Sequence, residues 1–174
     1  MKRKRFTEEQ NVAGGLKQFG VFGEQRNDGV ELTINRQAAP GLRLIGGRSI
    51  VDARLRKASG GVNLGNRAVG VPAWMGNLGL EWDISATALT LTGRFVHTGK
   101  QAVNVANTLE LAEWTRFDLG ARYVLIAEGR PVTLRVGVNN VANKRYWASA
   151  FDVFLAALLQ GQPRTWKFSV SADF

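Results

Sequence analysis

The chain has 174 residues, 23 Lys and Arg against 14 Asp and Glu, a formal net charge of +9, no cysteine and one histidine. This length suggests one domain or a piece of a larger protein, and the lack of cysteine excludes disulfides and thiolate metal sites. The 20 glycines exceed the ~7% of an average chain, which favours a turn-rich β protein over a helical one.

Residues 1–15 read MKRKRFTEEQNVAGG, a basic start without the apolar run of ~7–15 residues that a signal peptide contains. A secreted β-barrel needs such a peptide. Either the chain is cytoplasmic or its true N-terminus lies upstream, and we prefer the second alternative. No apolar run approaches the ~20 residues of a membrane-spanning helix. Residues 1–19 remain an unassigned N-terminal segment.

Seven segments alternate between apolar and polar residues, the pattern of strands with one apolar face. A strand of about ten residues is long enough to cross a bilayer at a tilt. We therefore predict an all-β fold of about seven or eight antiparallel transmembrane strands. The segments are 30–35, 42–55, 74–82, 89–95, 117–125, 132–139 and 166–174.

The connections between these segments alternate in length. Residues 38–41, 83–88 and 127–131 are short, whereas 56–70, 100–113 and 143–162 are long. Short turns on one side and long loops on the other are typical of outer-membrane barrels, with the short side periplasmic. Within the last long connection, residues 148–159 have apolar side chains at helical spacing, and we predict a helical or irregular stretch there.

The last strand resembles the assembly signal of outer-membrane barrels, because apolar residues occupy every second position up to an aromatic end. The alternative is an ordinary last strand of a soluble sheet. We also predict that aromatic residues near strand ends form an interfacial girdle rather than a packed core. The predicted signal comprises Trp166, Phe168, Val170, Ala172 and Phe174, and the girdle comprises Trp74, Trp82, Trp114, Tyr123, Tyr146, Trp147 and Trp166.

Four basic residues lie on the polar sides of these strands, namely Arg94, Arg122, Arg135 and Lys167. In a barrel they face the lumen, either as a solvated or salt-bridged wall, which we favour, or as partners of a plug or an anion. The other charges are scattered, which argues against a nucleic-acid-binding stripe. His97 has no nearby His or Cys, and the glycine-rich residues 60–65 precede no helix. We predict no catalytic, cofactor-binding or metal-binding residue, and no enzyme.

Short motifs over residues 20–174 together resemble the TonB-dependent siderophore receptors of the ferrichrome and pyoverdine type. In chain order they are Gly23-Glu24-Gln25-Arg26 and Gly29-Val30-Glu31-Leu32, Pro40-Gly41-Leu42, Asp52-Ala53-Arg54-Leu55, Gly65-Asn66 with Gly70-Val71-Pro72, Trp114-Thr115-Arg116-Phe117-Asp118-Leu119-Gly120-Ala121-Arg122-Tyr123, Val138-Asn139-Asn140-Val141 with Lys144-Arg145-Tyr146-Trp147, and Pro163-Arg164-Thr165.

The resemblance implies that residues 20–174 form the C-terminal portion of a 22-stranded barrel whose N-terminal plug is absent from this chain. Such receptors lie in the Gram-negative outer membrane and take up ferric siderophores, using energy that the TonB complex delivers through the plug. The implied partners are a ferric siderophore, the TonB complex, outer-membrane lipid and the barrel assembly machinery. Without a plug, the fragment is not expected to transport by itself.

Two alternatives remain open. Seven strands cannot close an antiparallel sheet on itself, and an open edge is not tolerated in lipid. An eighth strand from residues 5–19 would give a small eight-stranded outer-membrane barrel with a structural or adhesive role. The third hypothesis is a soluble basic β protein that binds nucleic acid or a small ligand, but no second sheet is predicted to cover the apolar face.

Overall fold

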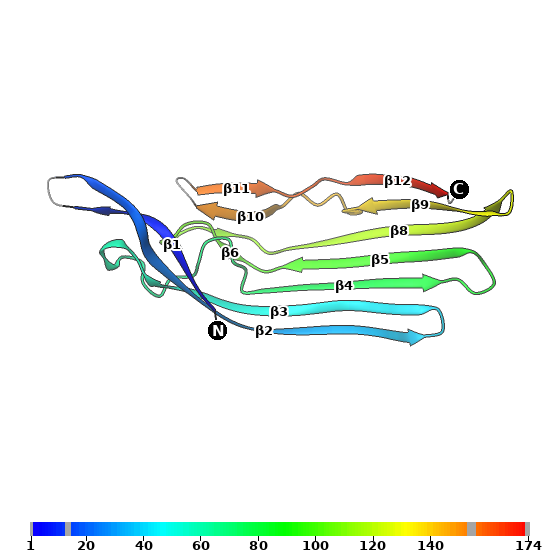
Figure 1. Ribbon diagram of the computed structural model, residues 1–174, viewed down its shortest axis with the longest axis horizontal. Helices are drawn as coiled ribbons and strands as arrows, with labels where there is room; N and C mark the ends of the chain where they lie inside the picture. Colours follow the sequence, from blue (N-terminus) through cyan, green and yellow to red (C-terminus); the bar gives the residue numbers. More distant parts are fainter. Residues whose placement is uncertain (1, 13–14, 153–155, 173–174) are drawn as a thin grey trace.

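The structure, a computed structural model, describes residues 2–12, 15–152 and 156–172. Its main element is one antiparallel sheet of eight strands in the order β1-β2-β3-β4-β5-β8-β9-β12, drawn as a single layer in Figure 1. The predicted fold class is therefore confirmed. The strands are β1 (Lys2–Asn11), β2 (Lys17–Ala39), β3 (Leu42–Lys57), β4 (Trp74–Asp83), β5 (Leu89–Thr98), β8 (Trp114–Ala127), β9 (Arg130–Asn139) and β12 (Thr165–Ala172).

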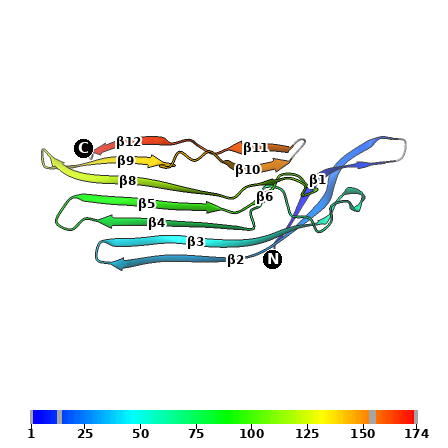
Figure 2. The same cartoon turned by 180° about the vertical axis from the view of Figure 1, so that it is seen from behind.

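The connections divide the sheet into a turn end and a loop end. At the turn end, short turns join β2 to β3, β4 to β5 and β8 to β9, and all three lie together in Figure 2. Between β8 and β9 the turn residues Glu128 and Gly129 both have positive φ, 52° and 80°, as a tight two-residue hairpin requires. The loop end contains η1 (Ser59–Gly61), β6 (Gln101–Ala102), β7 (Glu110–Leu111), β10 (Trp147–Asp152) and β11 (Ala156–Gln160).

The predicted helical or irregular stretch at residues 148–159 is wrong. β10 and β11 form an antiparallel hairpin with Ala150 opposite Leu158, whereas residues 153–155, including Phe154 and Leu155, lie outside the described residues. Periodicity in such a short apolar run does not distinguish a strand from a helix. Packing decides here, because Ala150 is buried at 3% exposure against the neighbouring loops.

β2 is the longest strand, with 23 residues. Its residues 24–39 pair with β3, and β1 pairs with Lys17–Asn27, so that β1 and β3 flank β2 together only along residues 24–27. β1 and β12 stand at opposite ends of the strand order, so the described strands form an open sheet and not a closed eight-stranded barrel. Figure 1 shows β1 and the first half of β2 as an arm that extends past the loop end.

The main sheet has an apolar face and a polar face. The apolar face carries Phe168 and Val170, which are 75% and 72% exposed. Directly paired residues point to the same side of a sheet, so Trp166 shares this face with its partner Val138 on β9 and with Leu119 on β8. Such a row of large exposed apolar side chains marks a contact surface.

A small cluster of buried apolar residues lies at the loop end. Val103, Leu111 and Ala150 pack together with Val69, and these residues come from three different connections. Buried Gln101 donates from Nε2 to the carbonyl oxygen of Ala148 at 3.2 Å. The long loops therefore pack on one another. None of the helices described in this chain is long and apolar enough to cross a membrane.

Candidate functional site: the charged polar face

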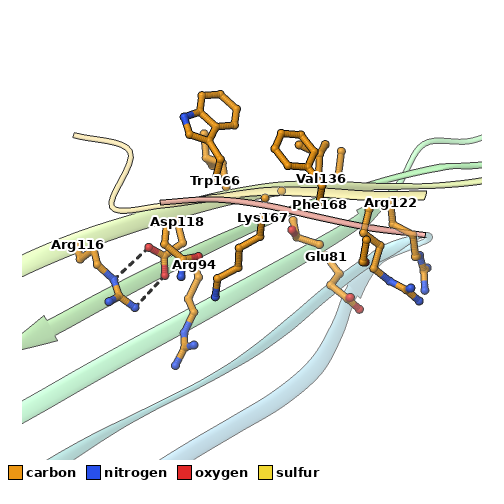
Figure 3. A pocket seen from close by; sticks show the side chains of 17 residues that line it. Glu81, Arg94, Arg116, Asp118, Arg122, Val136, Trp166, Lys167 and Phe168 are labelled. Carbon is orange, nitrogen blue, oxygen red and sulfur yellow. Dashed lines mark hydrogen bonds and ion pairs between the residues drawn. The ribbon is translucent and has the colours of Figure 1, made fainter. Parts of the chain in front are cut away.

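Strand register brings the predicted basic residues onto one face. In the strand register, Arg122 of β8 lies directly opposite Arg135 of β9, and Arg94 of β5 lies directly opposite Asp118 of β8. In Figure 3, Arg94, Arg122 and Lys167 project to one side of the sheet, whereas Trp166, Phe168 and Val136 project to the other. All four predicted basic residues line one hollow of about 910 Å³.

A network of ion pairs joins four strands at the turn end of the polar face. Arg43 of β3 contacts Glu81 at 3.2 Å and Asp83 at 2.8 Å, both on β4. Thr90 of β5 donates to Asp83 at 2.7 Å and accepts from Arg122 of β8 at 3.0 Å. Asp83 thus gathers two arginines and a hydroxyl, which holds neighbouring strands in register.

Towards the middle of this face the positive charge lacks carboxylate partners. Within the described part of the chain, no ion pair engages Arg94, Arg135 or Lys167, although Arg135 donates to the hydroxyl of Ser171 at 3.0 Å. Arg122, in contrast, lies 3.8 Å from Asp83. This part of the face has an excess of positive charge.

Near the loop end, a buried asparagine organises the connection after β9. Asn140 is 1% exposed and its Nδ2 donates to the carbonyl oxygens of Lys144 and Gln162, each at 2.9 Å. Its backbone N–H donates to Asp118 at 2.8 Å, and Asp118 also pairs with Arg116 at 3.1 Å. The motif around Asn140 therefore shapes the polar face by holding this connection against β8.

The predicted aromatic girdle is only partly present. Trp82, Tyr123 and Trp166 are 52%, 46% and 60% exposed on the apolar face. Trp114 is instead buried and packs against Tyr146, with ring centroids 4.3 Å apart. The prediction is wrong for this pair, because Trp114 lies on the polar side of β8, where the β9–β10 connection covers it.

Sequence reasoning missed the cluster around Asp83. Arg43 and Asp83 are separated by 40 positions, and their contact depends on the pairing of β3 with β4. The available signal was that Arg43, Glu81 and Asp83 occupy the polar positions of alternating segments, which places all three on the polar face of adjacent strands. Among the residues that the structure describes, no three His, Cys, Asp or Glu side chains lie together in a way that holds a metal ion.

An antiparallel single-layer sheet with one apolar face, short turns at one end and packed long loops at the other defines the wall of an outer-membrane-type β-barrel. The chain belongs to the family described as TonB dependent receptor-like, beta-barrel, which matches residues 3–141. The family thus includes β1, which lies in the N-terminal segment left unassigned on sequence grounds.

Named relatives agree with this membership. The chain is 43% identical to the ferrichrome receptor FcuA of Yersinia enterocolitica over 157 residues, which are 90% of this chain and 21% of FcuA. It is 30% identical to the metal-pseudopaline receptor CntO of Pseudomonas aeruginosa over 87% of this chain and 21% of CntO.

The solved structure of BauA, the ferric preacinetobactin receptor of Acinetobacter baumannii, superimposes with a TM-score of 0.84 at 38% identity. The match covers 99% of this chain and 26% of BauA. The chain therefore spans about a fifth to a quarter of the length of these relatives.

Proposed function

We propose that this chain forms the C-terminal wall of an outer-membrane receptor that takes up ferric siderophores. The observation that carries the proposal is the family match together with the 43% identity to a ferrichrome receptor. The open edges of the sheet support it, because β1 and β12 each lack a neighbour on one side and a complete barrel supplies one. The siderophore is the cargo, and the receptor is not an enzyme.

In this assignment the polar face borders the lumen and the apolar face contacts lipid. The exposed Phe168 and Val170 are then solvated by acyl chains, and Arg94, Arg122, Arg135 and Lys167 project towards the interior. The excess positive charge of this wall suits an anionic neighbour in the lumen, either cargo or plug. Energy from the TonB complex reaches the receptor through the plug, which lies outside this chain.

We also assign β12 the role of the assembly signal read by the barrel assembly machinery. Trp166, Phe168, Val170 and Ala172 alternate along β12, and β12 pairs with β9 alone. Its other edge is thus available for the first strand of a complete barrel. The last predicted member of the signal, Phe174, lies outside the described residues.

A chimera tests the receptor function. The C-terminal fifth of FcuA is replaced by this chain, and the chimera is expressed in a Gram-negative host that lacks its own siderophore receptors. We expect a heat-modifiable band in the outer-membrane fraction and uptake of radioactive iron from at least one of a panel of ferric siderophores.

Two controls interpret the result. The same chimera with Val170→Arg should insert poorly, because it places a charge on the lipid side. The same chimera with Ser171→Arg should insert normally. A chimera that reaches the outer membrane as a folded barrel but takes up none of the siderophores would contradict the proposed function.

A further inference from the structure

Arg48 is a cation among apolar residues on the apolar face of the sheet. It lies on β3 directly opposite Leu32 of β2 and Gly76 of β4, and on its own strand it shares this face with Leu44 and Ile50. Its side chain is exposed, and no ion pair or hydrogen bond to Arg48 occurs within residues 2–12, 15–152 and 156–172. An unpaired charge on a lipid-facing surface is unfavourable unless an anion from outside compensates it.

Aromatic rings hold Arg48 in place. Its guanidinium carbon lies 4.8 Å from the ring centroid of Trp74, within the range of a cation–π contact. The other neighbour of Trp74 is His97, with ring centroids 4.0 Å apart and ring planes 17° from parallel. Nδ1 of His97 is in turn 2.8 Å from the hydroxyl of Thr115. Gly76, which has no side chain, leaves room for the indole between Arg48 and His97.

The change from apolar to charged residues places Arg48 near a membrane surface. Four residues further towards the loop end on the same face, Asp52 pairs with Arg54 at 2.7 Å, and on β2 Arg26 pairs with Asp28 at 2.6 Å. Four residues of strand span about 13 Å. Arg48 therefore lies towards the loop side of the apolar band, and its long side chain can extend in the direction of the headgroup layer there.

The charged rim beyond it is also basic. Glu24 is shared between Arg3 at 3.7 Å and Lys57 at 3.8 Å, so that one carboxylate serves two cations. A guanidinium presents a planar fork of donors that matches a phosphate group. A rim with surplus positive charge and an unpaired arginine just inside the apolar band together favour an anion anchored at the membrane surface.

We infer that Arg48 and Trp74 form a binding site for the phosphate group of a membrane lipid in the leaflet on the loop side. The guanidinium of Arg48 binds the phosphate, and the ring of Trp74 both orients the guanidinium and contacts the start of the acyl chain. The inference rests on the proposed function, because it requires the apolar face to contact lipid.

Fluorescence quenching tests the site. The FcuA chimera, with every tryptophan other than Trp74 replaced by Phe so that Trp74 alone reports, is reconstituted into phosphatidylcholine vesicles that contain either brominated phosphatidic acid or brominated phosphatidylcholine. Bromine quenches an indole that it touches. We expect a roughly fivefold enrichment of phosphatidic acid beside Trp74, the ratio that one interfacial arginine supplies at an anionic surface.

Matched variants identify the responsible group. Arg48→Gln should remove the preference for phosphatidic acid, and Arg48→Lys should retain part of it as a point charge. Arg94→Gln, on the polar face, should leave the preference unchanged. Loss of the preference in Arg94→Gln as well would overturn the inference, because net charge and not this site would then be responsible.

The quenching also separates the two proposals. Equal quenching of Trp74 by both brominated lipids would overturn the phosphate site and leave the lipid-facing assignment intact. If neither brominated lipid quenched Trp74, the apolar face would not contact lipid, and both the lipid-facing assignment and the phosphate site would be overturned.

Discussion

Arg122 on β8 lies directly opposite Arg135 on β9, so that two guanidinium groups share one position on the polar face. Arg122 donates to Thr90 on β5, whereas Arg135 donates to Ser171 on β12, each at 3.0 Å. The two side chains are thus drawn to opposite sides of the pair. Like charges directly opposite each other destabilise a sheet, so the pair favours a surrounding that supplies negative charge.

Neutralising one member of this pair should stabilise the sheet. Arg135→Gln removes the repulsion and loses only a hydroxyl contact, so we expect the free energy of unfolding to rise by about 0.5 kcal/mol. Arg122→Gln relieves the same repulsion but loses the contacts with Asp83 and Thr90 and should show no gain. Urea unfolding of the FcuA chimera in detergent micelles measures both, and equal destabilisation by the two variants would contradict the expectation.

The assignment of faces predicts opposite tolerance of charge at neighbouring positions of β12. Val170→Arg places a charge on the lipid side and should cost about 2–4 kcal/mol near the bilayer midplane. Ser171→Arg, which faces the polar side beside Arg135, should cost at most about 1 kcal/mol. Unfolding of the FcuA chimera in phospholipid bilayers provides the measurement, and equal costs would refute the assignment.

The packing of the long loops depends on a close approach at Gly70. Gly70 and Gly61 have the same φ of 70°. A Cβ at Gly70 would collide with the carbonyl oxygen of Ala150, whereas a Cβ at Gly61 would have no atom within 4 Å. Gly61→Ala should therefore cost only the ~1–2 kcal/mol of a left-handed backbone. Gly70→Ala should cost more and separate the loop from β10, seen as faster amide hydrogen exchange at Ala102 and Ala150.

Asn140 is predicted to hold the β9–β10 connection through its side chain. Asn140→Ala loses three side-chain hydrogen bonds in a buried site. It also places an alanine at a φ of 53°, in the left-handed region. We therefore expect the free energy of unfolding to fall by about 2–4 kcal/mol. Asn140→Gly loses the same bonds but accommodates this φ, and should be about 1 kcal/mol less destabilised. Limited proteolysis within residues 143–162 should be faster in both. An Asn140→Ala variant as stable as the native chain would contradict this role.

Much of the sheet was predictable because alternation is a local property. In β12 and β9, each side chain points away from its neighbours, so sequence parity alone places Phe168 and Lys167 on opposite faces, as Figure 3 shows. The short turns were equally visible, since Pro40-Gly41 and Glu128-Gly129 interrupt the alternating segments. The family motifs agree with the relatives found.

The remaining features depend on contacts between distant residues. The hairpin of β10 and β11 was mistaken for a helical stretch because its short apolar run fits both periods. The arm formed by β1 and the first half of β2 alternates weakly, and pairing across the hairpin, not a sequence pattern, defines it. The girdle prediction failed for Trp114 and Tyr146 because a later connection covers the end of β8.

The sequence by itself thus determined the strands, their two faces and the receptor family, because a strand's side-chain period of two is set by its own backbone. Only the tertiary structure decided which charges meet. Arg43 reaches Asp83, Arg122 opposes Arg135, and Arg48 stands unpaired over Trp74. The physical reason is strand register, since a shift of one residue between neighbouring strands would exchange every one of these partners.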